Sequence, residues 1–128
     1  MSTQQVFAYD PRSVAAARHW VGARLADVAA PLLGQVELMV SELASNAISH
    51  ARSAFTVRIE RAGHHTRISV ADAGEGVPRV QAPNMSALHG RGLLIVDALA
   101  AQWGVDYLRD HSGKIVWFTV ADDAPTSA

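Results

Sequence analysis

The sequence predicts an α+β fold, a two-layer α/β sandwich in which helices cover one face of a mixed, mostly antiparallel sheet. Between residues 10 and 52 apolar residues recur at helical spacing, whereas the strands expected later alternate apolar and polar residues and come in pairs joined by turns. The helices are too few and the hairpins too many for a doubly wound parallel sheet. The expected element order is therefore β-α-α-β-β-α-β-β.

The chain has 128 residues, which is enough for one domain with a real hydrophobic core. No internal repeat or linker divides it. We expect a single domain over residues 1–128, with its core at about 6–120 and a disordered tail at 121–128.

Composition excludes several classes of function. The chain is 49% hydrophobic and 18% charged with a net charge of −1, so neither nucleic acid nor a membrane surface is expected as its main partner. Cysteine is absent, which excludes disulfides and thiolate chemistry. The N-terminus lacks the apolar stretch of a signal peptide, and no apolar run approaches the roughly 20 residues of a membrane span. The expected location is the cytoplasm.

The N-terminal half is expected to contain one strand and two helices. Gln4 to Tyr9 alternates weakly and is predicted to be a short strand. Asp10 and Pro11 are typical of a helix start, and helical spacing continues to about Ala30. After a break, a second helix is predicted from about Gln35 to Arg52. The apolar stripe of this second helix consists of Val36, Val40, Leu43, Ala47 and Ala51.

The C-terminal half changes to the period of strands. A hairpin, a long loop rich in Gly and Pro, a third helix and a second pair of strands are expected in that order. The predicted strands lie at 55–60, 66–71, 105–108 and 115–120, the loop at 73–90 and the helix at 91–102.

Glu42 and Asn46 are the first candidate site residues. They stand one helical turn apart and so project from one face of the second helix, beside its apolar stripe. A carboxylate next to an amide could combine a catalytic base with a Mg²⁺ ligand, because Mg²⁺ prefers hard oxygen ligands and usually takes only one or two from protein. Taken alone, the pair is more simply explained as solvated helix surface. His50 follows one turn later and either faces the same pocket or caps the helix C-terminus.

The second candidate is the segment Asp72-Ala73-Gly74-Glu75-Gly76-Val77-Pro78, directly after a buried strand. A carboxylate at the end of such a strand needs a partner, and the exocyclic amino group of adenine is a suitable donor. Gly74 and Gly76 would let the backbone lie close to a flat ring. The simpler alternative is a glycine-rich turn.

The third candidate is His89-Gly90-Arg91-Gly92-Leu93, which opens the third helix. Free backbone amides at a helix N-terminus favour anions, and Arg91 adds a possible fork for phosphate. A plain loop-to-helix junction is the alternative. The segment matches neither the Walker pattern nor the dinucleotide-binding fingerprint, so we reject a P-loop or Rossmann interpretation.

Together and in this order, the three segments resemble the ATP-binding domain of the GHKL superfamily. The similarity is closest to small stand-alone members, the bacterial anti-sigma factor serine kinases and related actinobacterial ATP-binding regulators. Ser41 to Ala51 resembles the N box of the family, Asp72 to Pro78 its first glycine box and Gly90 to Val96 its second. Ala101 to Gly104 and Gly113 to Trp117 resemble the closing segments of the actinobacterial branch.

The resemblance covers about Val6 to Val120 and implies the Bergerat fold, also called the histidine kinase-like ATPase fold. It also implies ATP and Mg²⁺ as cofactors. Asn46 would coordinate Mg²⁺, Glu42 would act as general base and Asp72 would bind the adenine amino group. The resemblance further implies that Gly74 and Gly76 line the base. It implies that Gly90, Arg91, Gly92 and Leu93 offer backbone amides to the phosphates. His50, if it faces the same pocket, is a further candidate nucleotide contact.

Two departures from the family pattern bear on activity. The segment between Gly76 and Gly90, which would be the ATP lid, is short. The family often has Thr at the position of Ile115, where its hydroxyl bridges to the adenine-binding Asp. In this chain Thr119 falls on the same face of that strand as Ile115.

These features leave three functions to compare. The first is an anti-sigma-type serine/threonine protein kinase, which binds a sigma factor, phosphorylates an antagonist protein and so regulates transcription. The second is an ATP-dependent regulatory binding module without useful kinase activity. Glu42 favours the kinase, whereas the short lid and Ile115 favour the module. The third is an α+β domain that binds no nucleotide. No direct contact with nucleic acid or membrane is expected, and a homodimer is suggested by the resemblance only.

Overall fold

The computed structural model describes residues 1–73, 90–108 and 113–121. The elements follow the predicted order. The strands are β1 (Ser2–Phe7), β2 (Phe55–Ala62), β3 (His65–Asp72), β4 (Gln102–Tyr107) and β5 (Lys114–Ala121). The helical segments are α1 (Arg12–Arg24), α2 (Ala30–Asn46), the π-helical η1 (Ala47–Ala51) and α4 (Gly90–Leu99).

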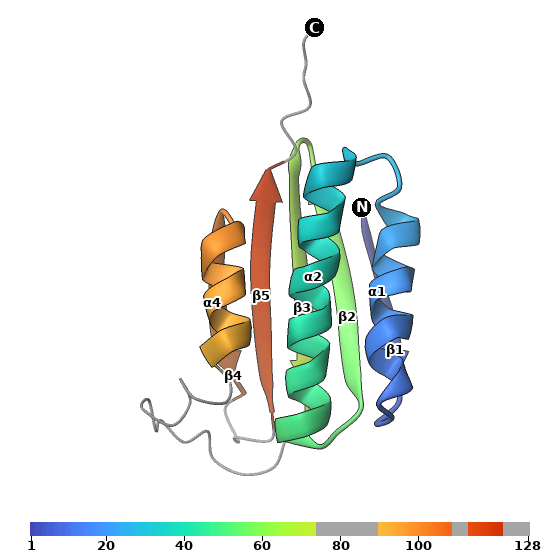
Figure 1. Ribbon diagram of the computed structural model, residues 1–128, viewed down its shortest axis with the longest axis vertical. Coiled ribbons are helices and arrows are strands. Elements are labelled where there is room, and N and C mark those ends of the chain that lie inside the picture. The colour runs from blue at the N-terminus through green and yellow to red at the C-terminus, as the bar shows by residue number, and fades with distance from the viewer. Residues whose placement is uncertain (74–89, 109–112, 122–128) are drawn as a thin grey trace, which may run out of the picture.

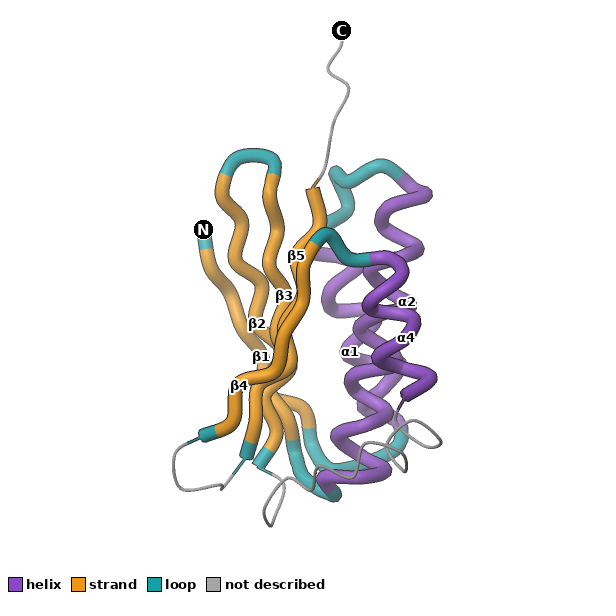
Figure 2. Tube along the Cα trace, turned by 90° about the vertical axis from the view of Figure 1, so that its left-hand side faces the viewer, coloured by secondary structure: helices purple, strands orange, loops and turns teal. Residues whose placement is uncertain are grey.

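The five strands that the structure describes form one sheet in the order β1-β2-β3-β5-β4. Every pair of neighbouring strands is antiparallel. Helices α1, α2 and α4 all lie on one side of this sheet (Figure 1, Figure 2). The predicted two-layer α+β sandwich is therefore confirmed. In the part of the chain that the structure describes, no helix is long and apolar enough to cross a membrane.

The buried core lies between the helical layer and the sheet. Alternate residues of β2, β3 and β5 point into it, as strand geometry requires. The sheet contributes Phe7, Phe55, Val57, Ile59, Ile68, Val70, Val116, Phe118 and Val120. The helices contribute Ala17, Val21, Val36, Met39, Val40, Leu43, Ala44, Ala47 and Val96.

The connection between α1 and α2 differs from the expectation. Helix α1 ends at Arg24, yet Leu25 and Val28 remain buried, so their spacing continued the apolar helical pattern without being helical. Pro31, predicted as a break, lies in the first turn of α2. Proline is tolerated there because the first backbone N–H groups of a helix have no internal partner.

The third helix is also shorter than predicted. It ends at Leu99, and Gln102, which the prediction assigned to the helix, begins β4. The change of direction is fixed by two backbone bonds. The N–H of Ala100 still donates to Val96 at 2.8 Å, whereas that of Ala101 donates across to Thr119 of β5 at 2.8 Å.

On the sheet face opposite the helices, the Trp117 ring packs over Gly104. Gly104 of β4 is paired with Trp117 of β5. A Cβ atom at Gly104 would lie 2.7 Å from the Trp117 ring, so the ring needs glycine at that position. The guanidinium of Arg67 lies over the same ring, 4.3 Å from its centre.

Candidate functional site

Asp72 is the last residue of β3 and, among the residues whose burial the structure describes, the only charged one that is buried. Its place in the sheet fixes its neighbours. The register pairs it with Phe55 on β2 and with Lys114 on β5. Because directly opposed residues point to the same face of a sheet, Asp72 and Lys114 both face the helical layer.

The two side chains form an ion pair. Lys114 Nζ lies 2.7 Å from Asp72 Oδ2, and the Asp72 side chain is only 5% exposed against 29% for Lys114. Such a charge-assisted bond supplies the partner that a buried carboxylate requires. The predicted need for a partner is thus met, in this structure, by a residue of the chain itself.

This pairing corrects the expectation about Ile115. Ile115 is paired with Ala71, not with Asp72, and so lies on the opposite face of the sheet, as does Thr119. Neither side chain faces Asp72. Lys114, and not the following residue Ile115, lies beside the Asp72 carboxylate.

Gly113 allows the two strands to meet at this point. A Cβ atom there would run into the backbone carbonyl oxygen of Asp72 and would lie 3.1 Å from Cα of Ala73. The Gly113 carbonyl accepts a bond from the N–H of Leu108 at 3.0 Å, which closes the β4–β5 connection. Close backbone packing therefore holds Lys114 beside Asp72.

The C-terminal end of α2 reaches the same region. Glu42 and Asn46 are both half-buried on the last turns of α2. The chain then widens into η1, and Arg52 ends it in the left-handed conformation with φ 55°. Just beyond, Ser53 Oγ accepts a bond from the N–H of Ala73 at 3.1 Å, which ties this end of the helix to the end of β3.

His50 belongs to the π-helical segment η1. π-turns are rare, contain an extra residue per turn and occur often at functional sites. His50 lies in this widened turn and is exposed, although it has an interaction partner. It sits at the helix end, where a basic side chain complements the terminal carbonyl groups.

Helix α4 begins at the same end of the molecule (Figure 1). Gly90, Arg91 and Gly92 form its first turn, where backbone N–H groups lack helical partners. Leu93 is half-buried and packs against the core. The structure thus gathers the predicted N box, the end of β3 and the start of α4 at one end. Gly74 and Gly76 lie outside the described residues.

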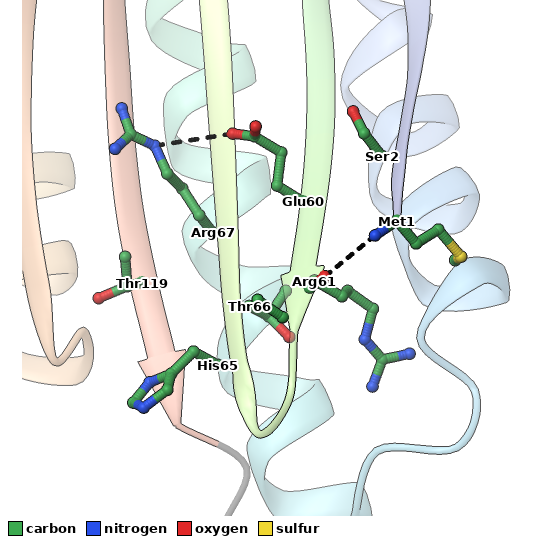
Figure 3. Close-up of a pocket in the computed structure, with 9 residues that line it drawn as sticks. Met1, Ser2, Glu60, Arg61, His65, Thr66, Arg67 and Thr119 are labelled. Carbon is green, nitrogen blue, oxygen red and sulfur yellow. Dashed lines mark hydrogen bonds and ion pairs between the residues drawn. The ribbon is translucent and has the colours of Figure 1, made fainter.

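A surface hollow of about 480 Å³ lies at the other end of the sheet (Figure 3). It lies beside the β2–β3 hairpin, and the residues that line it include His65, Thr66 and Arg67 at the start of β3. Asp72 ends the same strand, which places it roughly 20 Å away at strand spacing. The hollow is therefore separate from the site around Asp72.

The profile of the family described as histidine kinase-like ATPase domain matches residues 7–120. The chain belongs to this family. The domain is of the GHKL type, in agreement with the resemblance of the three motifs, and membership in this ATPase family supports ATP binding. Among curated protein sequences no match was found.

Solved structures share the fold of this ATPase domain. The RsbU and RsbW domains of Rv1364c from Mycobacterium tuberculosis align over 94% of the chain with a TM-score of 0.73 and 17% identity. A blue-light activated histidine kinase, Erythrobacter litoralis EL346, aligns over 75% with a TM-score of 0.60 and 30% identity. The chain spans 32% of the length of each of these two. The histidine kinase AdeS from Acinetobacter baumannii aligns over 94% of the chain with a TM-score of 0.52 and 16% identity, and the aligned part covers 68% of the AdeS chain.

Sequence reasoning missed Lys114 as a site residue. One signal was available, because Lys114 is the only lysine in the chain and directly follows a glycine. Its partner, however, is 42 residues away, and only the strand register brings the two together.

Proposed function

We propose that this domain binds Mg-ATP and acts as an anti-sigma-type serine/threonine protein kinase, which holds a sigma factor inactive and phosphorylates an antagonist protein. The observation that carries the proposal is the half-buried Glu42, one turn before Asn46, on the helix whose end is tied to β3. A carboxylate there suits a general base, and a module that only bound nucleotide would not need one.

Nucleotide binding would use the end of β3 and the start of α4. The carboxylate of Asp72 would accept a hydrogen bond from the exocyclic amino group of adenine. Backbone amides of Gly90 to Leu93, at the start of α4, would donate to phosphate oxygens, and the partial positive charge of the helix N-terminus would favour them. Phosphoryl transfer depends mainly on such positioning and charge neutralisation.

In the transfer step, a serine or threonine hydroxyl oxygen of the antagonist would attack the γ-phosphorus. The new O–P bond forms as the bond between the γ-phosphorus and the β,γ-bridging oxygen breaks, and ADP leaves. Glu42 would accept the hydroxyl proton. When bound, Mg²⁺ supplies charge neutralisation at the phosphates, and Asn46 would hold it through its amide oxygen, a hard ligand of the kind Mg²⁺ prefers.

Transfer of radiolabel from the γ-position of ATP to a cognate antagonist tests the kinase. Glu42→Gln keeps the size of the side chain and removes the base. We expect transfer to fall at least about a hundredfold, within the range of general base catalysis, while ATP binding is retained. Glu37→Gln on the same helix is the matched control and should leave transfer unchanged. Undiminished transfer by Glu42→Gln would exclude Glu42 as the base.

The alternative is an ATP-dependent regulatory binding module without useful kinase activity. The shortness of the segment between Gly76 and Gly90 favours it, because a short lid covers less of the γ-phosphate. In this case ATP would change the affinity for a protein partner and no phosphoprotein would form. Partner capture with and without ATP, run beside the transfer assay, separates the two functions.

A further inference from the structure

We propose that Lys114 is a specificity-determining residue of the nucleotide site. Its ammonium group, anchored on Asp72, donates a hydrogen bond to N1 of adenine. The inference rests on the proposed ATP-binding function and adds a direct contact to the base by a residue that none of the three motifs contains.

The ammonium is anchored in a defined place. Lys114 Nζ lies 2.7 Å from Asp72 Oδ2, and Asp72 is nearly inaccessible while Lys114 retains partial exposure. An ammonium has three N–H donors, so a bond to the carboxylate leaves donors for a second acceptor. A ligand that reaches Asp72 from the exposed side would therefore meet the lysine as well.

The backbone supports this placement. Lys114 begins β5 and faces the helical layer, directly opposite Asp72. The preceding Gly113 is buried against the backbone of Asp72 and Ala73, which fixes the start of the strand. The pair is thus built into the sheet by register and close packing, and does not depend on a surface rotamer alone.

The pair presents an acceptor beside a donor. Adenine presents the complementary pattern on its Watson–Crick edge, because the 6-amino group donates and the adjacent N1 accepts. Guanine presents the reverse at the same positions, an accepting O6 and a donating N1–H. With the base in one orientation, the carboxylate and the ammonium favour adenine and oppose guanine. A carboxylate without the lysine would contact only the 6-amino group and would not recognise N1.

The direct test compares ATP with 1-deaza-ATP, in which N1 is replaced by C–H and the 6-amino group is kept. Titration calorimetry in the presence of Mg²⁺ on the full chain gives both affinities. We expect the wild-type protein to bind 1-deaza-ATP about ten- to a hundredfold more weakly than ATP, the range for a hydrogen bond from a charged donor.

Lys114→Met removes the donor and keeps an unbranched side chain. This variant should bind ATP about ten- to a hundredfold more weakly than the wild type and should no longer distinguish ATP from 1-deaza-ATP. Lys114→Gln retains a neutral donor and should keep part of the preference. The matched control is Arg61→Met, which removes one positive charge at the hairpin end and should change neither affinity. Thermal unfolding of each variant verifies that it is folded.

Three results would overturn the inference. If the wild type binds ATP and 1-deaza-ATP equally, N1 is not contacted, and the inference fails while ATP binding stands. If Lys114→Met binds ATP as tightly as the wild type or more tightly, the lysine only neutralises Asp72 and does not contact the bound adenine. If the wild type binds neither nucleotide, the inference and the proposed function both fail.

Discussion

The two ends of the sheet each contain an ion pair, and the two pairs differ in what surrounds them. At the hairpin end, Arg61 Nη1 lies 2.9 Å from Asp27 Oδ1, and the Asp27 side chain is 67% exposed. At the opposite end, Lys114 lies 2.7 Å from Asp72, whose side chain is 5% exposed. The lengths are similar, but water reaches the Asp27 carboxylate freely and hardly reaches the Asp72 carboxylate.

The difference indicates what each pair does. Exposed ion pairs contribute little to stability because water and salt screen them. A buried charge must be removed from water, and its pairing often does no better than a well-packed apolar pair. Stability alone therefore gives little reason for the Asp72–Lys114 pair, whereas the proposed contacts with a nucleotide base would give one.

The largest effect on folding is expected from Gly113→Ala. The added methyl group would collide with the Asp72 backbone, which cannot yield as a flexible side chain can. We expect a loss of about 3 kcal/mol in the free energy of unfolding, the upper range for overpacking. Gly34→Ala on helix α2 is the control, because its methyl group meets nothing within 4 Å. It should be neutral or slightly stabilising in chemical denaturation. Equal behaviour of the two variants would contradict the close packing.

Breaking the buried pair should have the next largest effect. Asp72→Leu or Lys114→Met alone should lower the free energy of unfolding by about 2 kcal/mol, below the usual cost for a fully buried pair because Lys114 is partly exposed. The double variant should recover most of this loss, since no unpaired charge remains. Denaturant titration of all four proteins completes the cycle. Additive losses in the double variant would show that the two side chains are not coupled and would contradict the buried pair.

A smaller effect is expected at the hairpin turn. Gly63 has φ 63°, a conformation that costs about 1 kcal/mol for most L-residues. Gly63→Ala should lose about that amount, whereas Gly63→Asn should lose less, because Asn tolerates the left-handed region better. Nucleotide affinity should be the same in both variants. Thermal unfolding and ATP titration of the same samples check both statements, and weakened ATP binding would link the two ends.

The smallest effects should come from two carboxylates at the surface, Asp10 and Asp27. Hydrogen bonds from the Arg12 side chain and backbone lower the pKa of Asp10 from 3.8 to about 2, and the bond from the Arg61 side chain lowers the pKa of Asp27. A lowered pKa stabilises the fold above the unfolded value near 4, and this contribution is lost as the pH falls toward 2. NMR titration should find the Asp10 midpoint near 2, rising toward 3.8 in Arg12→Met. An unchanged midpoint would contradict the pairing.

The sequence predicted the element order because the relevant patterns are local. Alternation around Val57 and around Ile68 marks strands directly, and the stripe from Val36 to Ala47 marks a helix face. The end of α1 was misplaced because Leu25 and Val28 are buried by tertiary packing while lying outside a helix. Periodicity alone cannot separate these cases.

The sequence predicted Asp72 as a site residue but did not predict that Lys114 pairs with it. The prediction started β5 at Ile115, one residue after its observed first residue, and set Ile115 against Asp72. A shift of one residue reverses the face of every side chain in a strand, so Lys114 was overlooked. The partner of Asp72 depends on a contact between distant strands, which no local pattern encodes. Similarly, nothing in the residue types of Ala47 to Ala51 indicates a π-helix.

Calorimetric titration with Mg-ATP tests whether the end of the sheet around Asp72 binds ATP. We expect saturable binding to the wild type, weakened on the order of a hundredfold in Asp72→Ala by loss of a charge-assisted bond, and unchanged in Asp27→Ala. In a parallel thermal unfolding experiment, ATP at 100 times its Kd should raise the free energy of unfolding of the wild type by about 2.7 kcal/mol. No binding by the wild type, or equal binding by Asp72→Ala, would contradict the account.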